Sequence, residues 1–332
     1  MLILGIETSC DETAAAVVQA GQRVLANIVA TQFELHGQYG GVVPELAARR
    51  HQETILPVIR AALATADIGL KDLTAIAVTQ GPGLIGALVI GFAVAKSLAY
   101  ALQIPWVGVH HLHAHLAAPF LLDQPPAFPF IALVVSGGHT NLYKVAGFRQ
   151  ITLLGRSRDD AAGEAFDKVA KLLNLGYPGG VAIERLAATG DPQAFPLPRP
   201  RIPEEPLTFS YSGLKTAVAV LVRQRPDLLT DVRAKADLAA SFQAAVVDSL
   251  VSRALLAVHS HACHRLVVAG GVAANQRLRQ ELQVQAQTAG IALYLPPLAL
   301  CTDNAAMVAA LGYHLLQEGE TLDLRADVFA RG

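Results

Sequence analysis

The sequence contains few cysteines, few aromatic residues and little charge. Its 332 residues include 3 cysteines and 1 tryptophan, and charged side chains make up only 16% of the chain. Cys10, Cys263 and Cys301 are odd in number, and they have neither the spacing of a zinc knuckle nor that of a disulfide framework. A disulfide-stapled extracellular domain is therefore excluded, and we expect a reducing, cytoplasmic location.

An excess of either charge is also lacking. The chain has 26 lysines and arginines against 27 aspartates and glutamates, and its formal net charge is −1. Proteins that bind nucleic acid through bulk electrostatics carry a strong basic excess, and this chain is not one of them. A nucleic-acid substrate would have to be bound by a local patch or by partner proteins.

Long apolar runs are missing as well. The longest, from Leu84 to Ala95, contains Gly86 and Gly91 and ends at Lys96, which is shorter than the roughly 20 residues that span a bilayer. We predict a buried helix there and no membrane association. The first six residues lack a basic region and are followed by Glu7, so we expect no signal peptide. With 52% hydrophobic residues, the chain is long enough for two domains and a large buried core.

Histidine is concentrated in one short stretch. Four of the 11 histidines stand at positions 110, 111, 113 and 115, between an apolar strand-like run and a predicted helix. On a helix, residues four apart share a face, so His111 and His115 lie side by side while His113 points away. Two imidazoles at this spacing can chelate a divalent metal. A single histidine on an apolar helix is usually a packed core residue, but four in six residues favour a metal site.

A zinc peptidase is the first alternative for such a pair. Its H-E-x-x-H helix needs a glutamate beside the first histidine as general base, and Leu112 stands there instead. The pattern therefore favours a metal that positions or polarises a substrate.

The rest of the chain alternates strands and helices, and one pattern occurs twice. Residues 2–8 and 14–19 are predicted strands around a polar turn at 8–13, and residues 130–135 and 141–145 are strands around the turn Ser136-Gly137-Gly138-His139-Thr140. The proline-rich connection at 123–129 separates the two patterns. We predict two similar α/β lobes that face each other across a ligand cleft.

The turns of this pattern carry the chemistry. The first turn contains Asp11 and Glu12, although an ordinary solvated hairpin turn would have the same composition. In the second turn two glycines allow the backbone to approach a ligand, and consecutive amides can bind an anion or a developing oxyanion. Glycine-rich junctions of strand and helix follow at residues 80–86 and 270–275.

Four further positions allow two interpretations each. Asn275 and Asp303 each begin a predicted helix, where Asn275 could contact a ligand, Asp303 could be a third metal ligand, and either could be a plain N-cap. Asp167 and Lys168 lie on the predicted helix 162–175, either on an exposed face or beside a pocket wall formed by the glycine-rich loop 177–180. The proline-rich segment 195–203 cannot be regular structure, and we expect its Arg199 and Arg201 to form a basic surface.

Taken together, the motifs resemble the bacterial TsaD family of tRNA N6-adenosine threonylcarbamoyltransferases, once called O-sialoglycoprotein endopeptidases. The matching segments, in order along nearly the whole chain, are GIETSCDET (5–13), YGGVVPELAAR (39–49), GPGLIGAL (81–88), HHLHAH (110–115), LVVSGGHT (133–140), DDAAGEAFDK (159–168), YPGG (177–180), FSYSGLKT (209–216), AGGVAAN (269–275) and CTDNAAM (301–307). One departure is visible: the family often has H-M-E-G-H where this chain has His111-Leu112-His113-Ala114-His115. The chelating pair is unaffected by that change.

The resemblance implies an α/β fold of two RNase H-like, actin-like lobes with a ligand cleft between them, as in the actin/Hsp70/sugar-kinase (ASKHA) superfamily. Residues 1–125 would form the N-terminal lobe, to which the C-terminal helix at 305–330 could belong. Residues 126–332 would form the second lobe, with a helical insertion at about 160–235.

The resemblance also implies the reaction. A threonylcarbamoyl group would pass from threonylcarbamoyl-AMP to N6 of the adenosine just 3′ of the anticodon, position 37, in tRNAs that read codons starting with A, and AMP would leave. His111, His115 and Asp303 would bind one divalent metal ion, Fe²⁺ or Zn²⁺. The residues expected to bind the adenylate are Val134, Val135, Ser136, Gly137, Gly138, Asp167, Gly180, Glu184 and Asn275. Asp11 and Glu12 are our candidates for the catalytic proton acceptor.

The implied partners are tRNA, the catalytically inactive paralogue TsaB, the small ATPase TsaE, and a separate synthase that supplies the adenylate. Three alternatives compete with this function. A metallopeptidase lacks its glutamate at position 112, and a small-molecule kinase of the same superfamily would bind Mg²⁺ through carboxylates rather than a histidine pair. A non-catalytic scaffold is the third.

Overall fold

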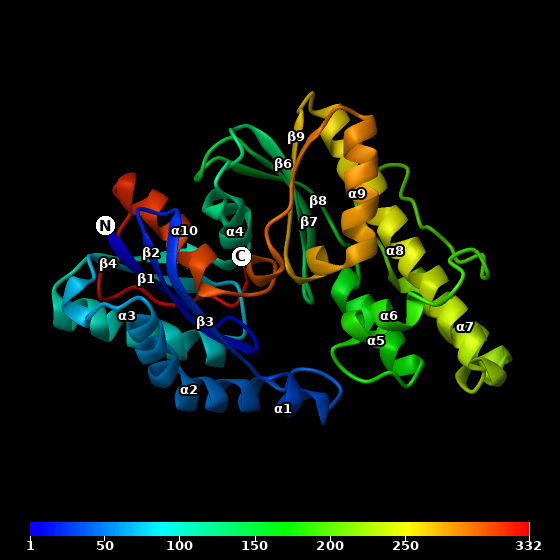
Figure 1. The fold of residues 1–332 in the computed structure, drawn as a ribbon, viewed down its shortest axis with the longest axis horizontal. Coiled ribbons are helices and arrows are strands. Elements are labelled where there is room, and N and C mark those ends of the chain that lie inside the picture. The colour runs from blue at the N-terminus through cyan, green and yellow to red at the C-terminus, as the bar shows by residue number, and fades with distance from the viewer. Residues whose placement is uncertain (332) are drawn as a thin grey trace. The chain divides into compact units, whose positions relative to one another are not determined.

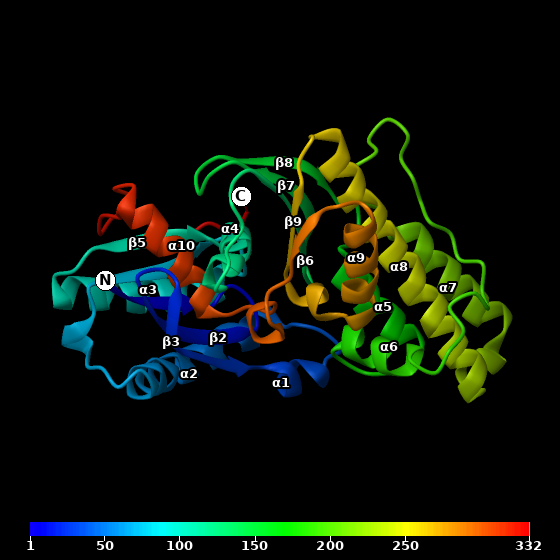
Figure 2. The ribbon, with the colours of Figure 1, turned by 45° about the horizontal axis from the view of Figure 1, so that its top comes forward.

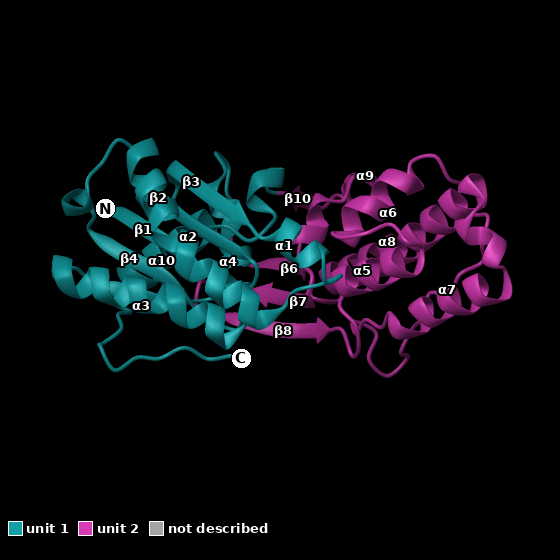
Figure 3. Cartoon of the chain, turned by 90° about the horizontal axis from the view of Figure 1, so that it is seen from below, with its two compact units in different colours: residues 1–126, 296–332 teal, residues 127–295 magenta. Residues whose placement is uncertain are grey.

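The computed structural model describes residues 1–331 and divides into two compact units (Figure 3). Unit 1 contains residues 1–126 and the C-terminal segment from Pro296, and unit 2 contains residues Ala127–Leu295. The chain leaves unit 1 at the proline-rich connection and returns to it for the last helix.

Unit 1 is built around a five-stranded sheet of order β3-β2-β1-β4-β5 (Figure 1). Its strands are β1 (Leu2–Glu7), β2 (Glu12–Gln19), β3 (Arg23–Thr31), β4 (Ala75–Gly81) and β5 (Trp106–His110). The first three strands are antiparallel, and β4 and β5 run parallel to β1. Its helices are α1 (Phe33–Gly37), α2 (Pro44–Thr65), α3 (Ile85–Leu102), α4 (His111–Ala117) and α10 (Ala305–Gln317).

Both faces of this sheet are buried because helices cover each of them. Side chains alternate along a strand, so Leu4 and Ile6 pack with α2 and α3 in one apolar cluster. Gly5, between them, faces α10 so closely that an added Cβ would lie 2.2 Å from the carbonyl oxygen of Ala305. The near-continuous apolar sequence of β1 follows from this two-sided burial.

Unit 2 repeats the same sheet. Its strands are β6 (Phe130–Val135), β7 (Thr140–Val145), β8 (Ile151–Arg156), β9 (Arg265–Ala269) and β10 (Ala292–Tyr294), in the order β10-β9-β6-β7-β8. As in unit 1, the first three strands are antiparallel and the last two run parallel to the first. The prediction of two similar α/β lobes is therefore confirmed.

The helices of unit 2 are α5 (Ala162–Leu172), α6 (Gly179–Ala187), α7 (Ser212–Gln224), α8 (Val232–Ser260) and α9 (Gln276–Thr288). Figure 2 shows α8 and α9 beside strands β6 and β9. On α8, Phe242 is fully buried and meets the ring of Phe166 on α5 edge to face, with centroids 5.3 Å apart. Five short 3-10 helices complete the described chain: Leu70–Asp72, Ala118–Leu121, Pro226–Leu229, Gly271–Ala274 and Leu298–Leu300.

Two elements differ from the sequence predictions. Strand β8 was not predicted, and helix α6 begins at Gly179, inside the predicted loop 177–180. Most of the apolar run 84–95 lies in helix α3, which continues past Lys96 to Leu102. The Lys96 ammonium donates to the carbonyl of Ala326 and lies over the ring of Phe92, so its charge is accommodated within unit 1.

Two helices, α3 and α8, are long and apolar enough to cross a membrane by length and composition alone. Core helices satisfy the same criterion, and 78% of the apolar window of α8 is buried. Helix α3 is less covered, since its Ile85, Val89 and Tyr100 are exposed. The prediction that this run forms a buried helix holds only for one face of α3, which carries Leu88 and Phe92.

The start of α7 is capped by a residue far away in the sequence. The sequence predicts a capped helix start at 209–215, and the helix begins at Ser212. The side chain of the preceding N-cap residue, Tyr211, forms no capping hydrogen bond. Instead the Asp159 carboxylate accepts hydrogen bonds from the amides of Tyr211 and Ser212 and from the hydroxyls of Ser210 and Ser212. Burial acts to raise the pKa of Asp159, but these hydrogen bonds outweigh it and lower the pKa below its usual range.

We predict that Asp159→Ala lowers the free energy of unfolding by about 1–2 kcal/mol, the usual loss for a helix cap. Because the folded-state pKa is depressed, the contribution is present at neutral pH and disappears as the pH falls below about 4. Denaturant unfolding at several pH values measures both effects. The matched control is Asp123→Ala, at an exposed position, and equal stability of the two variants at pH 7 would contradict the prediction.

Candidate functional site

The histidine stretch lies at the junction of β5 and α4 in unit 1. Strand β5 ends at His110 and α4 begins at His111. His111 and His115 are one turn apart on α4, are both buried, and have ring centroids 5.0 Å apart. His113 points elsewhere and stacks on His110, with centroids 4.0 Å apart. Helical spacing alone therefore brings the imidazoles of His111 and His115 together.

Asp303 joins this pair from the C-terminal segment of the same unit. Its Oδ1 lies 3.1 Å from Nε2 of His115 and 3.7 Å from Nε2 of His111. The alternative in which Asp303 caps α10 is wrong, because the Asn304 side chain is the cap and accepts from the amide of Met307. Asp303 is thus directed at the imidazoles rather than at the helix.

These three side chains could hold a metal ion. One ligand atom from each of His111, His115 and Asp303 lies within 4.8 Å of the others. Metal bonds of about 2.1 Å place neighbouring ligand atoms about 3.0–3.4 Å apart, close to the two separations between Asp303 and the imidazoles. Two imidazoles and one carboxylate are a donor set for iron or zinc, and three protein ligands leave coordination positions for a substrate.

A second carboxylate, which the sequence analysis missed, lies behind His111. Glu7 ends β1 and is fully buried, and its Oε2 is 3.1 Å from Nδ1 of His111. The same carboxylate accepts hydrogen bonds from the Thr79 hydroxyl and from the amide of Ser9. A carboxylate can only accept, so Nδ1 of His111 carries a proton, and Nε2 is the nitrogen on the Asp303 side that would bind a metal after losing its own proton. The signal in the sequence was a charged residue at the end of an otherwise apolar strand.

The charges of this cluster shift each other's pKa values. Burial acts to lower the pKa of His111, but the charges of Asp303 and Glu7 outweigh it and raise the pKa to about 9. Burial likewise acts to raise the pKa of Glu7, but the positive charge and hydrogen bond of His111 lower it. Both shifts show that the cluster attracts positive charge.

Asp11 and Glu12, the candidate proton acceptors, lie at the start of β2 and are both buried. Burial and the nearby charges of Asp303 and Asp11 raise the pKa of Glu12 well above its usual range. Oδ2 of Asp11 is buried and has no hydrogen-bond partner among residues 1–331. The predicted solvated turn is therefore a buried acidic segment.

The predicted ligand loop in unit 2 is a tight turn between β6 and β7. The amide of Ser136 donates to the carbonyl of His139, and the amide of His139 donates to the Ser136 hydroxyl. These two amides are occupied, so an anion site in this turn would use the amides of Gly137 and Gly138. A Cβ added at either glycine would meet nothing within 4 Å, which leaves their backbone open to a ligand. The side chains of Val134 and Val135 are fully buried, so these residues present only backbone atoms.

The other predicted substrate residues form hydrogen bonds within unit 2. The Asp167 carboxylate accepts from the amide of Gly179, while Gly180 is open on its Cβ side. Asn275 caps α9 by accepting from the amide of Leu278. Its amide group also donates to the side chain of Gln243. The cap alternative for Asn275 is thus observed.

Glu184 also contributes to the start of α9. Its carboxylate accepts from the amide of Gln276, the first residue of that helix. Unit 2 therefore contains all nine predicted substrate residues, and unit 1 contains the predicted metal ligands and both proton acceptors.

Comparison with known proteins identifies relatives along the whole chain. A model of the TsaD family, described as tRNA N6-adenosine threonylcarbamoyltransferase, matches residues 23–310. A protein of that name from Symbiobacterium thermophilum is 56% identical over 97% of this chain and 94% of its own length. Another from Syntrophus aciditrophicus is 52% identical over 100% of this chain and 97% of its own.

Solved structures of lower identity show the same fold. Component A of the (R)-2-hydroxyglutaryl-CoA dehydratase of Acidaminococcus fermentans is 19% identical, with a TM-score of 0.56 over 96% of this chain and 100% of its own. HypF of T. kodakarensis is 16% identical, with a TM-score of 0.62 over 96% of this chain and 48% of its own. The predicted actin-like, ASKHA-type α/β fold is confirmed. The chain belongs to the TsaD family, the tRNA N6-adenosine threonylcarbamoyltransferases.

Proposed function

We propose that His111, His115 and Asp303 bind one Fe²⁺ or Zn²⁺ ion and that the backbone of residues 134–138 binds threonylcarbamoyl-AMP. The enzyme is a transferase that attaches the threonylcarbamoyl group to N6 of adenosine in tRNA. The observation that carries the proposal is the approach of three donor atoms within 4.8 Å, with the buried Glu7 behind one of them. In this proposal the substrate adenosine is position 37, in tRNAs that read codons starting with A, and AMP is the leaving group.

The difficulty of the reaction is the weak nucleophilicity of an exocyclic adenine amine. Catalysis then depends on orienting the amine against the activated carbonyl and on stabilising the oxyanion. The amides of Gly137 and Gly138 are open donors for the oxyanion or the phosphate, and Asp167, Gly180, Glu184 and Asn275 shape the rest of the adenylate site. A bound metal would supply Lewis-acid polarisation of substrate oxygens.

A proton must also leave N6 as the new carbon–nitrogen bond forms and the bond from the carbonyl carbon to the phosphate oxygen breaks. Glu12 and Asp11 are the proposed acceptors. A carboxylate whose pKa is raised, as that of Glu12 is, becomes a stronger base near neutral pH than an ordinary glutamate. The proton would move from N6 to a carboxylate oxygen, and AMP would leave as the anion.

The remaining predicted partners belong to the same proposal. A separate synthase would supply the adenylate, and the inactive paralogue TsaB and the ATPase TsaE would act with this chain. Of the alternatives, a peptidase still lacks its base, because Leu112 is a buried apolar residue of α4. The kinase alternative has no support from the full-length relatives, whose shared name is that of a threonylcarbamoyltransferase.

We predict that His115→Ala and Asp303→Ala each abolish metal retention and threonylcarbamoyl transfer together, because a two-ligand remnant binds metal weakly. Elemental analysis measures the metal. Mass spectrometry of nucleosides measures the product after incubation of tRNA with the enzyme, its partners, the synthase, threonine, bicarbonate and ATP.

His113→Ala is the matched control, since it removes an imidazole of the same helix that points away from the cluster. Full metal occupancy in either ligand variant would refute the ligand set. A wild-type enzyme that forms no modified nucleoside in the complete system would refute the assigned reaction.

A separate prediction concerns Glu7. Replacing a carboxylate that orients a ligand histidine usually weakens metal affinity about 10–100-fold, so Glu7→Gln should raise the metal dissociation constant within that range. Competition with a chelator of known affinity measures the constant, and thermal unfolding of the metal-free protein verifies the fold. Glu45→Gln, at an exposed site on α2, is the control, and an unchanged constant in Glu7→Gln would show that Glu7 does not orient His111.

A further inference from the structure

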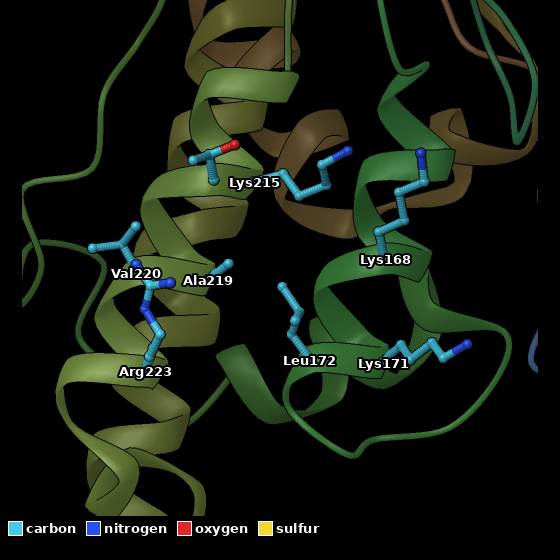
Figure 4. Close-up of a pocket in the computed structure, with 8 residues that line it drawn as sticks. Lys168, Lys171, Leu172, Lys215, Ala219, Val220 and Arg223 are labelled. Carbon is cyan, nitrogen blue, oxygen red and sulfur yellow. The ribbon is translucent and has the colours of Figure 1, made fainter.

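Unit 2 contains a basic groove between α5 and α7, and none of the residues assigned to the adenylate lines it. The groove has a volume of about 640 Å³ and is lined by eight residues, which are Lys168, Lys171, Leu172, Lys215, Thr216, Ala219, Val220 and Arg223 (Figure 4). Its floor is aliphatic, and four of its eight side chains are cationic. We call it the α5/α7 groove.

The cations of the groove fall into two pairs. Lys168 and Lys215 both donate to Asp160, through Nζ–O distances of 2.7 and 2.6 Å, so one carboxylate joins the two helices. Glu164 also pairs with Lys168, at 2.8 Å. Lys171 and Arg223 are exposed, and neither has a carboxylate partner within residues 1–331. After the two carboxylates are counted, the groove retains an excess of two positive charges.

The arrangement of these charges favours an extended anion over a compact one. Lys215, Ala219 and Arg223 stand at every fourth position of α7, so they form one stripe, about 12 Å from first to last Cα at 1.5 Å per residue. A site for a free nucleotide or phosphate gathers several polar groups onto one point. Here the cations are spread along two helices above an aliphatic floor, which is the pattern of a surface that follows a charged backbone.

The proline-rich segment 195–203, predicted to form a basic surface, is a weaker candidate for binding an extended anion. In the structure Arg199 pairs with Asp248 at 2.8 Å and also donates to the carbonyl of Leu197, so its charge is compensated. Only Arg201 of that segment is exposed without a carboxylate partner within residues 1–331. The groove offers more uncompensated positive charge than this segment does.

We propose that the α5/α7 groove binds the phosphodiester backbone of the tRNA substrate, with Lys171 and Arg223 as the principal contacts. The proposal rests on tRNA being the substrate and adds the surface that receives it. Helix α5 carries Asp167 of the assigned adenylate site one turn before Lys171, so the same helix would serve both substrates. Contacts to phosphate position an RNA without reading its sequence, which suits an enzyme that modifies several tRNAs.

The test compares tRNA binding by the full chain and by Lys171→Ala/Arg223→Ala, using unmodified tRNA and fluorescence anisotropy over a range of salt concentrations. Loss of two phosphate contacts should weaken binding on the order of tenfold at about 0.1 M salt and reduce the slope of log K against log salt by about 1.5. In steady-state transfer assays, the KM for tRNA should rise while kcat at saturating tRNA remains near wild type. Both residues are exposed, and thermal unfolding verifies that the variant is folded.

Three further variants make the test specific. Glu164→Gln removes a negative charge beside Lys168 and should tighten tRNA binding, an effect of opposite sign that a general loss of structure cannot produce. Lys71→Ala/Arg185→Ala removes the same two charges from exposed positions elsewhere and should leave the affinity unchanged. Arg199→Ala/Arg201→Ala measures the alternative surface, and a larger loss there than in the groove variant would overturn the proposal.

Other outcomes would also overturn it. Unchanged tRNA affinity in Lys171→Ala/Arg223→Ala would exclude the groove as an RNA surface. A raised KM for the adenylate, or competition by inorganic phosphate at micromolar concentration, would assign the groove to a small anion. Loss of binding to the paralogue with tRNA affinity intact would assign it to an acidic protein. In each case the wild-type enzyme still modifies tRNA, whereas failure of the assigned reaction would appear as no modified nucleoside in the wild type.

Discussion

The site in unit 1 depends on one imidazole that lies between two carboxylates. His111 meets the buried Glu7 on its Nδ1 side and Asp303 on its Nε2 side. Unpaired buried charges are costly, so such a group of ionisable side chains is stable only when opposite charges face each other. His111 faces two carboxylates, but one protonated imidazole supplies only one positive charge. The raised pKa of His111 reflects this excess of negative charge. A divalent cation would correct it, which is why this cluster is suited to a metal.

This cluster also explains why distant parts of unit 1 meet at one point. Glu7 comes from the end of β1, Thr79 from the adjacent parallel strand β4, and His111 from the start of α4, directly after β5. The carboxyl ends of parallel strands lie at the same edge of a sheet, where ligand sites of α/β proteins usually occur. The C-terminal segment then adds Asp303 and covers the other face of the sheet with α10.

The two units share a sheet order but not their chemistry. Unit 1 presents imidazoles and carboxylates at its strand ends, whereas the first turn of unit 2 presents glycine backbone. Gly163 and Gly270 explain why that turn is compact, since a Cβ at either would collide with the backbone of residues 135–137. Repetition of one fold thus places ionisable side chains at the strand ends of unit 1 and open glycine backbone at the first turn of unit 2. A net charge near zero does not exclude an RNA substrate, because the proposed α5/α7 groove would supply local positive charge.

Much of this was readable from the sequence, because it depends on local periodicity. Alternating apolar residues and polar turns predicted the repeated hairpin, and the spacing of His111 and His115 placed two imidazoles on one helical face. Contacts between segments far apart in the chain could not be predicted from local periodicity. No local pattern encodes the pairing of Glu7 with His111, the capping of α7 by Asp159 or the neutralisation of Arg199 by Asp248. Nor does a local pattern decide that Asn304 rather than Asp303 caps α10, because that depends on the direction of the backbone. Sequence periodicity determined which residues share a face, and only the tertiary structure decided which charges meet, because that depends on how strands far apart in the chain are ordered in a sheet.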